Sequence, residues 1–245
     1  MMRPGLVITC EHGGNHIPGA YRHLFQGQEA VLQSHRGFDP GALEMAETLA
    51  EAFGAVLVSS TVSRLLVDLN RSTHNPTLHA DAVRRLPAEQ RQEILTHFYQ
   101  PYRAQVEQAI RQTIADCGAV VHLSSHSFTP ELNGRLRKAD VGLLYDPRRP
   151  GEVALCQRWK AALLAAAPNL TVRRNYPYAG KGDGLTAWLR RCLGPDVYVG
   201  IELEINHKHV EAGHDWPTLR RQVAESLRAA LSLPTDPAQP APPTP

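Results

Sequence analysis

The stretch "GLVITCEHGGNHIPG" (residues 5–19) decides how the chain begins to fold, because its character changes within a few residues. It starts with an apolar, β-branched run, which predicts a buried strand over 5–10. Glu11, His12, a glycine pair and His16 come directly after it. A turn needs one or two such residues, so two imidazoles and a carboxylate beside two glycines indicate a functional loop. We expect the glycines to keep the loop thin enough for a ligand to approach its backbone.

The composition predicts a soluble globular protein. Of its 245 residues, 42% are hydrophobic and 20% are charged, which excludes a disordered chain. The net charge is +2 and the arginines are scattered, so nucleic-acid binding is not expected. No apolar run approaches the roughly 18 residues of a membrane span, and no signal-peptide core is found, so no membrane association is expected. Four widely spaced cysteines without a CxxC pair complete the prediction of a cytoplasmic protein with reduced thiols.

Predicted strands alternate with predicted helices along most of the chain. Strand patterns cover 5–10, 55–60, 119–127, 140–146, 170–175 and 197–206, and helix patterns cover 40–54, 88–118, 151–166, 185–194 and 215–232. Pro101 lies inside the longest helical pattern and predicts a break or kink that divides it into two helices. The alternation predicts an α/β single domain with a mixed, mostly parallel central sheet flanked by helices. We expect this domain to span 1–233, followed by a disordered Pro/Ala-rich tail at 234–245.

Polar residues follow several predicted strands, at the edge of the sheet where α/β proteins bind ligands. His12 follows the first strand, His126 lies near the end of the third, and Glu204 lies near the end of the last. Asp39 opens a predicted helix. Two imidazoles and carboxylates converging there would form a zinc set that leaves a fourth position for water. A carboxylate outside the set could then take the proton of that water.

Each of these residues also has a structural interpretation. A single histidine after a strand is commonly a hydrogen-bonded structural residue, and Asp39 before a proline is typical of a helix N-cap. Glu202 and Glu204 share one face of the last strand. A strand buried in an α/β sheet should be apolar on both faces, so carboxylates there are unfavourable unless paired or metal-bound. This favours a functional Glu204 and leaves the roles of Glu202, Glu11 and His16 open.

A second polar patch is the segment "SRLLVDLNRS" (63–72), in which Arg64, Asn70 and Arg71 flank an apolar run. Arginine forks suit the two oxygens of a carboxylate or phosphate, so these residues are candidates for binding a substrate. The alternative is a cluster of surface ion pairs, which contributes little to stability.

A third patch is the glycine-rich segment "RNYPYAGKGDG" (174–184), which contains Asn175, Lys181 and Gly182. Its glycines could let backbone N–H groups approach an anion, with the lysine beside them. It lacks the spacing of a nucleotide-binding P-loop. A mobile lid is the alternative interpretation.

The motifs "CEHGGNHIP", "SRLLVDLNRS", "HLSSHSF", "NYPYAGKGDG" and "GIELEIN" occur in this order between residues 5 and 210. As a set they resemble the N-formylglutamate amidohydrolase family, and in particular its branch of less characterised members. That family is similar in fold to zinc-dependent peptidases and cell-wall amidases, in which a mixed sheet lies between helices and zinc lies at the strand ends.

The resemblance implies a role for each candidate residue. It implies metal ligands at His12, Asp39 and His126, and a catalytic carboxylate at Glu204. It implies substrate binding by a larger set, which consists of Arg64, Asn70, Arg71, Asn175, Lys181 and Gly182. The implied cofactor is Zn²⁺, and other divalent cations bind nitrogen and oxygen ligands as well.

The activity implied by the resemblance is hydrolysis of the C–N amide of an N-acyl amino acid, with N-formyl-L-glutamate giving L-glutamate and formate. Its partner is therefore a small-molecule substrate. Three alternatives stay open: an amidase acting on a peptidoglycan-derived fragment or another N-acyl amino acid, a ligand-binding module without turnover, and a structural domain without metal. The sequence does not define the oligomeric state.

Overall fold

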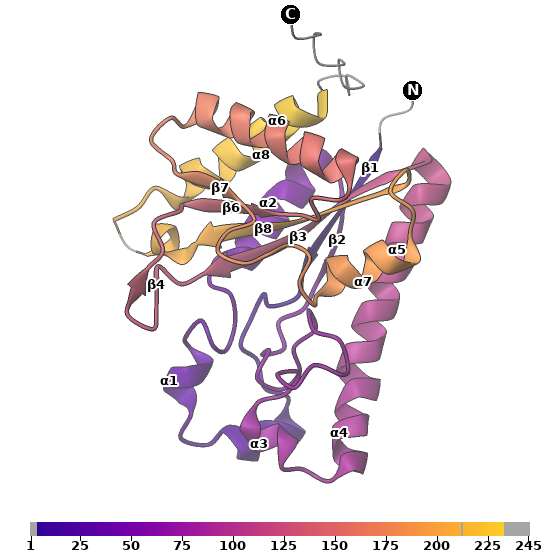
Figure 1. Ribbon diagram of the computed structural model, residues 1–245. Coiled ribbons are helices and arrows are strands. Elements are labelled where there is room, and N and C mark those ends of the chain that lie inside the picture. Colours follow the sequence, from indigo (N-terminus) through magenta and orange to yellow (C-terminus); the bar gives the residue numbers. More distant parts are fainter. Residues whose placement is uncertain (1–3, 212, 233–245) are drawn as a thin grey trace, which may run out of the picture.

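A six-stranded sheet forms the centre of the protein (Figure 1). The computed structural model describes residues 4–211 and 213–232. The strands are β1 (Gly5–Cys10), β2 (Val56–Ser59), β3 (Val120–Phe128), β6 (Val141–Leu144), β7 (Val172–Arg174) and β8 (Tyr198–Asn206), in the spatial order β2-β1-β3-β8-β6-β7. Every neighbouring pair is parallel except β6 and β8. The predicted α/β class with a mixed, mostly parallel sheet is therefore confirmed.

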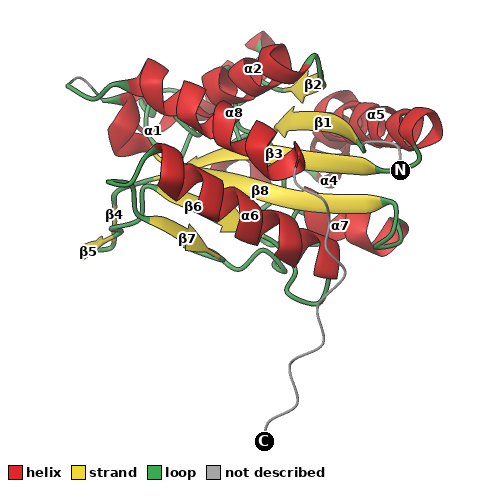
Figure 2. Cartoon of the chain, turned by 90° about the horizontal axis from the view of Figure 1, so that it is seen from above, coloured by secondary structure: helices red, strands yellow, loops and turns green. Residues whose placement is uncertain are grey.

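Helices cover both faces of the sheet (Figure 2). The helices that pack on the sheet are α2 (Ala42–Phe53), α6 (Pro150–Ala166) and α8 (Trp216–Ser232) on one face, and α5 (Gln100–Cys117) and α7 (Leu185–Cys192) on the other. Successive side chains of a strand point to opposite faces. Ile8 accordingly packs into the core under α2, α6 and α8, while Val7 packs into the core under α5 and α7.

The remaining elements are short and lie in the connections. They are η1 (Gly19–Phe25), α1 (Glu29–Leu32), α3 (Asp81–Arg84), α4 (Ala88–Ile94), the hairpin β4 (Glu131–Leu132) and β5 (Arg135–Leu136), and η3 (His207–Val210). The segments around α1 and α3 follow β1 and β2 and form the lower part of the molecule in Figure 1. These loop segments therefore lie beside the carboxyl ends of the parallel strands.

The long helical pattern divides into two α-helices, as expected, but the chain stays helical between them and Pro101 itself lies inside the second one. A π-helical segment, η2 (Leu95–Tyr99), joins α4 directly to α5, and Pro101 lies in the first turn of α5. The wider π turn gives the chain an alternative hydrogen bond, from Gln100 N–H to the carbonyl of Leu95. The absent proline N–H is thereby accommodated within a continuous helix.

The glycine pair of the first loop is needed for packing against the chain that leaves β2. Gly13 N–H donates to the carbonyl of Ser60, at 3.0 Å. A Cβ on Gly14 would lie 2.8 Å from the carbonyl oxygen of Thr61, closer than real Cβ atoms approach. The pair therefore lets two backbones lie side by side. The approach of a ligand to this loop, expected from the sequence, stays a prediction.

None of the helices within the described residues has the length and apolar character to cross a membrane. The four cysteines are free thiols. The expected tail at 234–245 lies outside the described residues, and the boundary at 233 stays a prediction.

A buried polar contact crosses the middle of the sheet at His122. Its Nε2 lies 2.9 Å from Thr9 Oγ1 and its Nδ1 lies 2.7 Å from the Tyr198 hydroxyl. His122 has no exposed surface, and this burial lowers its pKa from 6.5 to about 4. The folded protein therefore keeps the ring neutral.

This burial predicts a pH-dependent contribution to stability. Between pH 6.5 and about 4 the unfolded chain binds a proton at His122 that the folded chain does not, so this contribution falls as the pH falls through that window. The shift corresponds to roughly 3 kcal/mol. Urea unfolding of the parent and of His122→Gln should show the parent's advantage shrinking by about that amount over the window, because titrations common to both proteins cancel. A constant difference would contradict the prediction.

Candidate metal centre and active site

Three side chains from remote parts of the sequence meet at the carboxyl edge of the sheet. His12 follows β1, Asp39 precedes α2, and His126 lies near the end of β3. One nitrogen or oxygen atom from each lies within 4.8 Å of the others. All three are buried, with exposed fractions of 1%, 4% and 3%. The convergence expected from the sequence is therefore present in the fold.

Asp39 lies between the two histidine rings. Its Oδ2 is 3.3 Å from Nδ1 of His12 and 2.8 Å from Nδ1 of His126. Helix α2 begins at Ala42 after Gly41, without a side-chain cap. The helix-cap interpretation of Asp39 therefore does not describe its carboxylate, which belongs to the cluster.

The far nitrogen of each ring is held by a second carboxylate. Nε2 of His12 lies 2.8 Å from Oδ1 of Asp68, and Nε2 of His126 lies 2.9 Å from Oε2 of Glu11. A carboxylate on the outer nitrogen fixes the orientation of a ligating imidazole and makes its inner nitrogen a better electron donor. Both rings therefore present Nδ1 to the same point beside Asp39.

Glu11, whose role the sequence left open, is itself fully buried and multiply bound. It accepts hydrogen bonds from the Tyr102 hydroxyl at 2.9 Å and from Ser124 Oγ at 2.6 Å. Burial acts to raise the pKa of Glu11, but His126 and hydrogen bonds from Ser124 and Thr9 outweigh it and hold the pKa below its usual value. The sequence indicated Glu11 only through its position directly after a predicted buried strand. It did not indicate that Tyr102, on α5, would bind this carboxylate.

Arg64 connects the two sides of the cluster. Its guanidinium donates to Asp39 Oδ1 at 3.1 Å and to Asp68 Oδ2 at 2.8 Å. Burial acts to raise the pKa values of both carboxyls, but the charges of His12 and Arg64 and the hydrogen bonds from the histidines hold them below their usual values. Asp68 lies in the segment 63–72, but no role was predicted for it from the sequence. Arg64 was predicted to bind substrate, and in the structure its guanidinium binds the carboxylates of Asp39 and Asp68.

The donor set fits a divalent cation such as zinc. Two imidazole nitrogens and one carboxylate oxygen converge on one point, and each ring has an outer partner. A catalytic zinc commonly has three such protein ligands and one open position. His12, Asp39 and His126 are the residues that could hold it.

Glu204 faces the same space from the next strand. It is the register partner of His126 across the parallel pair β3 and β8. Both line one cavity of about 360 Å³. Oε2 of Glu204 is buried and has no hydrogen-bond partner among the described residues. Burial raises the pKa of Glu204 to about 8, with Asp39 and Glu202 adding to the effect and His126 opposing it.

Most of the other predicted site residues lie on the wall of this cavity, namely Arg64, Asn70, Arg71 and Gly182. Asn70 Oδ1 accepts from the N–H of Leu185 at 2.7 Å, which ties the cavity to the start of α7. Tyr178, which the sequence did not single out, also lines it. Glu202 lines it too, and its Oε1 accepts from Thr186 Oγ1 at 2.6 Å.

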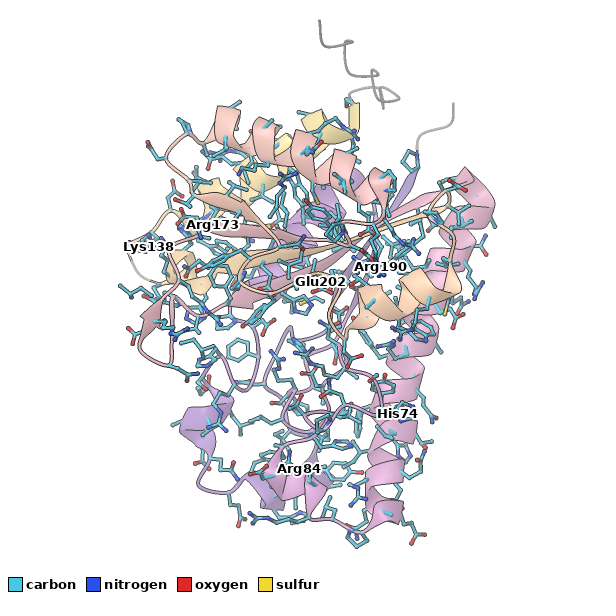
Figure 3. All side chains as sticks on the ribbon, viewed as in Figure 1. His74, Arg84, Lys138, Arg173, Arg190 and Glu202 are labelled. Carbon is cyan, nitrogen blue, oxygen red and sulfur yellow. The ribbon has the colours of Figure 1, made fainter. Side chains whose placement is uncertain are left out.

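Asn175 and Lys181 are not among the residues that line the cavity. Oδ1 of Asn175 accepts from the backbone N–H groups of Tyr145 and Gly180, each at 3.0 Å, and so holds the glycine-rich loop against β6. Lys181 lines a neighbouring cavity of about 500 Å³ beside Arg190, which Figure 3 labels on α7.

A family model for N-formylglutamate amidohydrolases matches residues 5–210. Among solved structures, the product of gene Atu2144 from Agrobacterium tumefaciens is 32% identical, with a TM-score of 0.78 over 94% of this chain and 92% of that chain. An N-formylglutamate amidohydrolase from Ralstonia eutropha is 21% identical and shares the fold, with a TM-score of 0.69 over 94% and 93% of the two chains. A search of curated proteins found no match.

The fold, the cavity and the family match together define a hydrolase of the amidohydrolase class. The chain belongs to the N-formylglutamate amidohydrolase family.

The burial of Glu204 predicts how its carboxyl titrates in the metal-free protein. With a pKa of about 8, it should stay protonated at neutral pH and lose its proton as the pH rises through that value. Carbon NMR of protein labelled in the glutamate carboxyls should show one signal titrating near pH 8, and Glu204→Gln should lack that signal. If every glutamate of the metal-free protein titrated below about pH 6, this description of the carboxyl would be wrong.

Proposed function

We propose that the protein is a metal-dependent amidohydrolase that cleaves the C–N amide of an N-acyl amino acid. The leading substrate is N-formyl-L-glutamate, which would give L-glutamate and formate, and the proposed metal is Zn²⁺ or another divalent cation. The observation that carries the proposal is the buried His12–Asp39–His126 cluster beside Glu204 on the same cavity wall, with Oε2 of Glu204 lacking a hydrogen-bond partner among the described residues. The family match supports the reaction class.

His12, Asp39 and His126 would hold the cation, and Glu11, Asp68 and Arg64 would keep those ligands in position. When bound, a divalent cation supplies positive charge that polarises the amide carbonyl and makes a water molecule more acidic.

Glu204 is the proposed general base and acid. Its carboxylate form is favoured when positive charge lies beside it. In that form Oε2 accepts a proton from the water that attacks the acyl carbon, and the protonated carboxyl returns this proton to the amide nitrogen as the C–N bond breaks. The products are a carboxylic acid and a free amine. A buried oxygen without another partner is suited to this exchange.

Arg71 is the proposed anchor for a substrate carboxylate. Arg64 is held by two short contacts, to Asp39 and Asp68. Among the described residues, the guanidinium of Arg71 makes one hydrogen bond, to the carbonyl of Asp183 at 2.7 Å, and a longer ion pair with Asp68, at 4.0 Å, and its side chain is 36% exposed. Its remaining N–H groups can bind a carboxylate with two hydrogen bonds.

A small-molecule substrate fits the cavity of about 360 Å³ that His126 and Glu204 line.

The four free thiols support the proposal of a reducing, cytoplasmic compartment.

Replacement of Glu204 tests the proposed base. Glu204→Gln keeps the shape but removes the proton acceptor, so kcat for N-formyl-L-glutamate should fall by about 10²–10⁴-fold. Formate release gives the rate, and elemental analysis should find unchanged zinc. Glu131→Gln, on the exposed hairpin strand β4, is the matched control and should keep parental activity. Full activity in Glu204→Gln would exclude this residue as the base.

A panel of N-acyl amino acids and muramyl-peptide fragments then separates the candidate substrates. N-formyl-L-glutamate should have the highest kcat/KM. Binding of metal and ligands without turnover across the panel would instead indicate a ligand-binding module.

Removal of an outer carboxylate should weaken metal binding without removing a ligand. Glu11→Gln and Asp68→Asn should each reduce zinc affinity by about 10–100-fold. The first removes the carboxylate that orients the ring of His126, and the second removes the carboxylate that orients the ring of His12. Competition with a chromophoric chelator measures the affinity. The control is Glu107→Gln, a half-buried residue of α5 that pairs with Arg111 and not with a member of the cluster. Parental affinity in both outer variants would contradict the arrangement.

A further inference from the structure

A second and larger cavity adjoins the proposed active site. It has a volume of about 610 Å³, and Arg64 and Arg71 line both cavities. It lies among the segments around α1 and α3, in the lower part of the molecule, where Figure 3 labels Arg84 below Glu202. Arg71, the proposed anchor of a substrate carboxylate, therefore stands where the two spaces meet.

The wall of the second cavity carries an excess of positive charge. Besides the two shared arginines it is lined by Arg36, Arg84 and Arg85. Arg84 pairs with Asp81, whereas the side chains of Arg36 and Arg85 have no ion pair or hydrogen bond with the described residues. An anion in this cavity would give these two guanidinium groups a partner.

The acidic residues on the same wall do not balance this charge. Asp68 is already bound by Arg64 and by His12, and Asp81 by Arg84. His35 and His79 complete the titratable groups of the wall. Potentials of one sign in a cleft raise the local concentration of ligands of the opposite sign.

We propose that the second cavity binds an anionic extension of the substrate, so that the enzyme accepts N-acyl peptides in which a second acidic residue follows the first. This rests on the proposed function. An acyl amino acid that reacts at the His12–Asp39–His126 cluster and reaches Arg71 with its carboxyl end would project any further residue past Arg71. The side-chain carboxylate of an acidic second residue would then lie among Arg36, Arg84 and Arg85.

Kinetics with three formylated compounds test the inference: N-formyl-L-glutamate, N-formyl-Glu-Glu and N-formyl-Glu-Lys. The zinc-loaded parent should prefer N-formyl-Glu-Glu over N-formyl-Glu-Lys by about tenfold or more in kcat/KM. The double variant Arg36→Gln/Arg85→Gln should lose about tenfold on N-formyl-Glu-Glu and change by less than about twofold on N-formyl-L-glutamate. The matched control is Arg174→Gln/Arg191→Gln, two exposed arginines outside both cavities, which should follow the parent on all three compounds.

Equal treatment of the acidic and basic dipeptides by the parent, or equal losses on the short and long compounds in the double variant, would overturn the inference. If the proposed function itself is wrong, the result is different: none of the three compounds is hydrolysed. Calorimetric binding of N-formyl-Glu-Glu then decides the matter separately. Weaker binding to the Arg36/Arg85 double variant than to the control would support the anionic subsite, and equal binding would overturn it.

Discussion

The carboxylate of Asp39, shared between Nδ1 of His12 and Nδ1 of His126, is the interaction on which the site depends. It brings buried ionisable groups together at the edge of the sheet, and buried charges are tolerated only when each is paired. The surrounding structure meets this requirement: Asp68 and Glu11 hold the outer ring nitrogens. Strands, loops and α5 each contribute a partner, so the positions of these elements and the geometry of the cluster support one another.

Glu204 differs from the other buried carboxylates in having an oxygen without a partner among the described residues. Asp39 and Glu11 are surrounded by donors that lower their pKa values, whereas burial raises that of Glu204 to about 8. Neighbouring carboxyls whose pKa values are moved in opposite directions can divide the work of holding charge and of carrying a proton. The register of β3 and β8, which pairs His126 with Glu204, places these two functions side by side.

Local pattern and the topology of α/β sheets were sufficient to predict the fold class and part of the site from the sequence. Alternating strands and helices indicated the class, and the rule that ligands bind at the carboxyl ends of strands brought His126 and Glu204 to one place. The partners of Glu11 could not be predicted, because Tyr102 lies 91 residues away on a helix whose register depends on packing. The chain stays helical between α4 and α5 through a π turn, which has no simple sequence signature. Lys181 lines a separate cavity although Gly182, the next residue, lines the proposed active site, and this difference was not visible in the sequence.

The most direct test of the proposed metal centre is a crystal structure of the zinc-treated protein, with diffraction data collected on both sides of the zinc absorption edge. We expect one anomalous peak per chain, about 2.0–2.2 Å from Nδ1 of His12, Nδ1 of His126 and a carboxylate oxygen of Asp39. A protein that shows no peak there, or binds zinc through other residues, would contradict the central claim that this cluster is a metal centre.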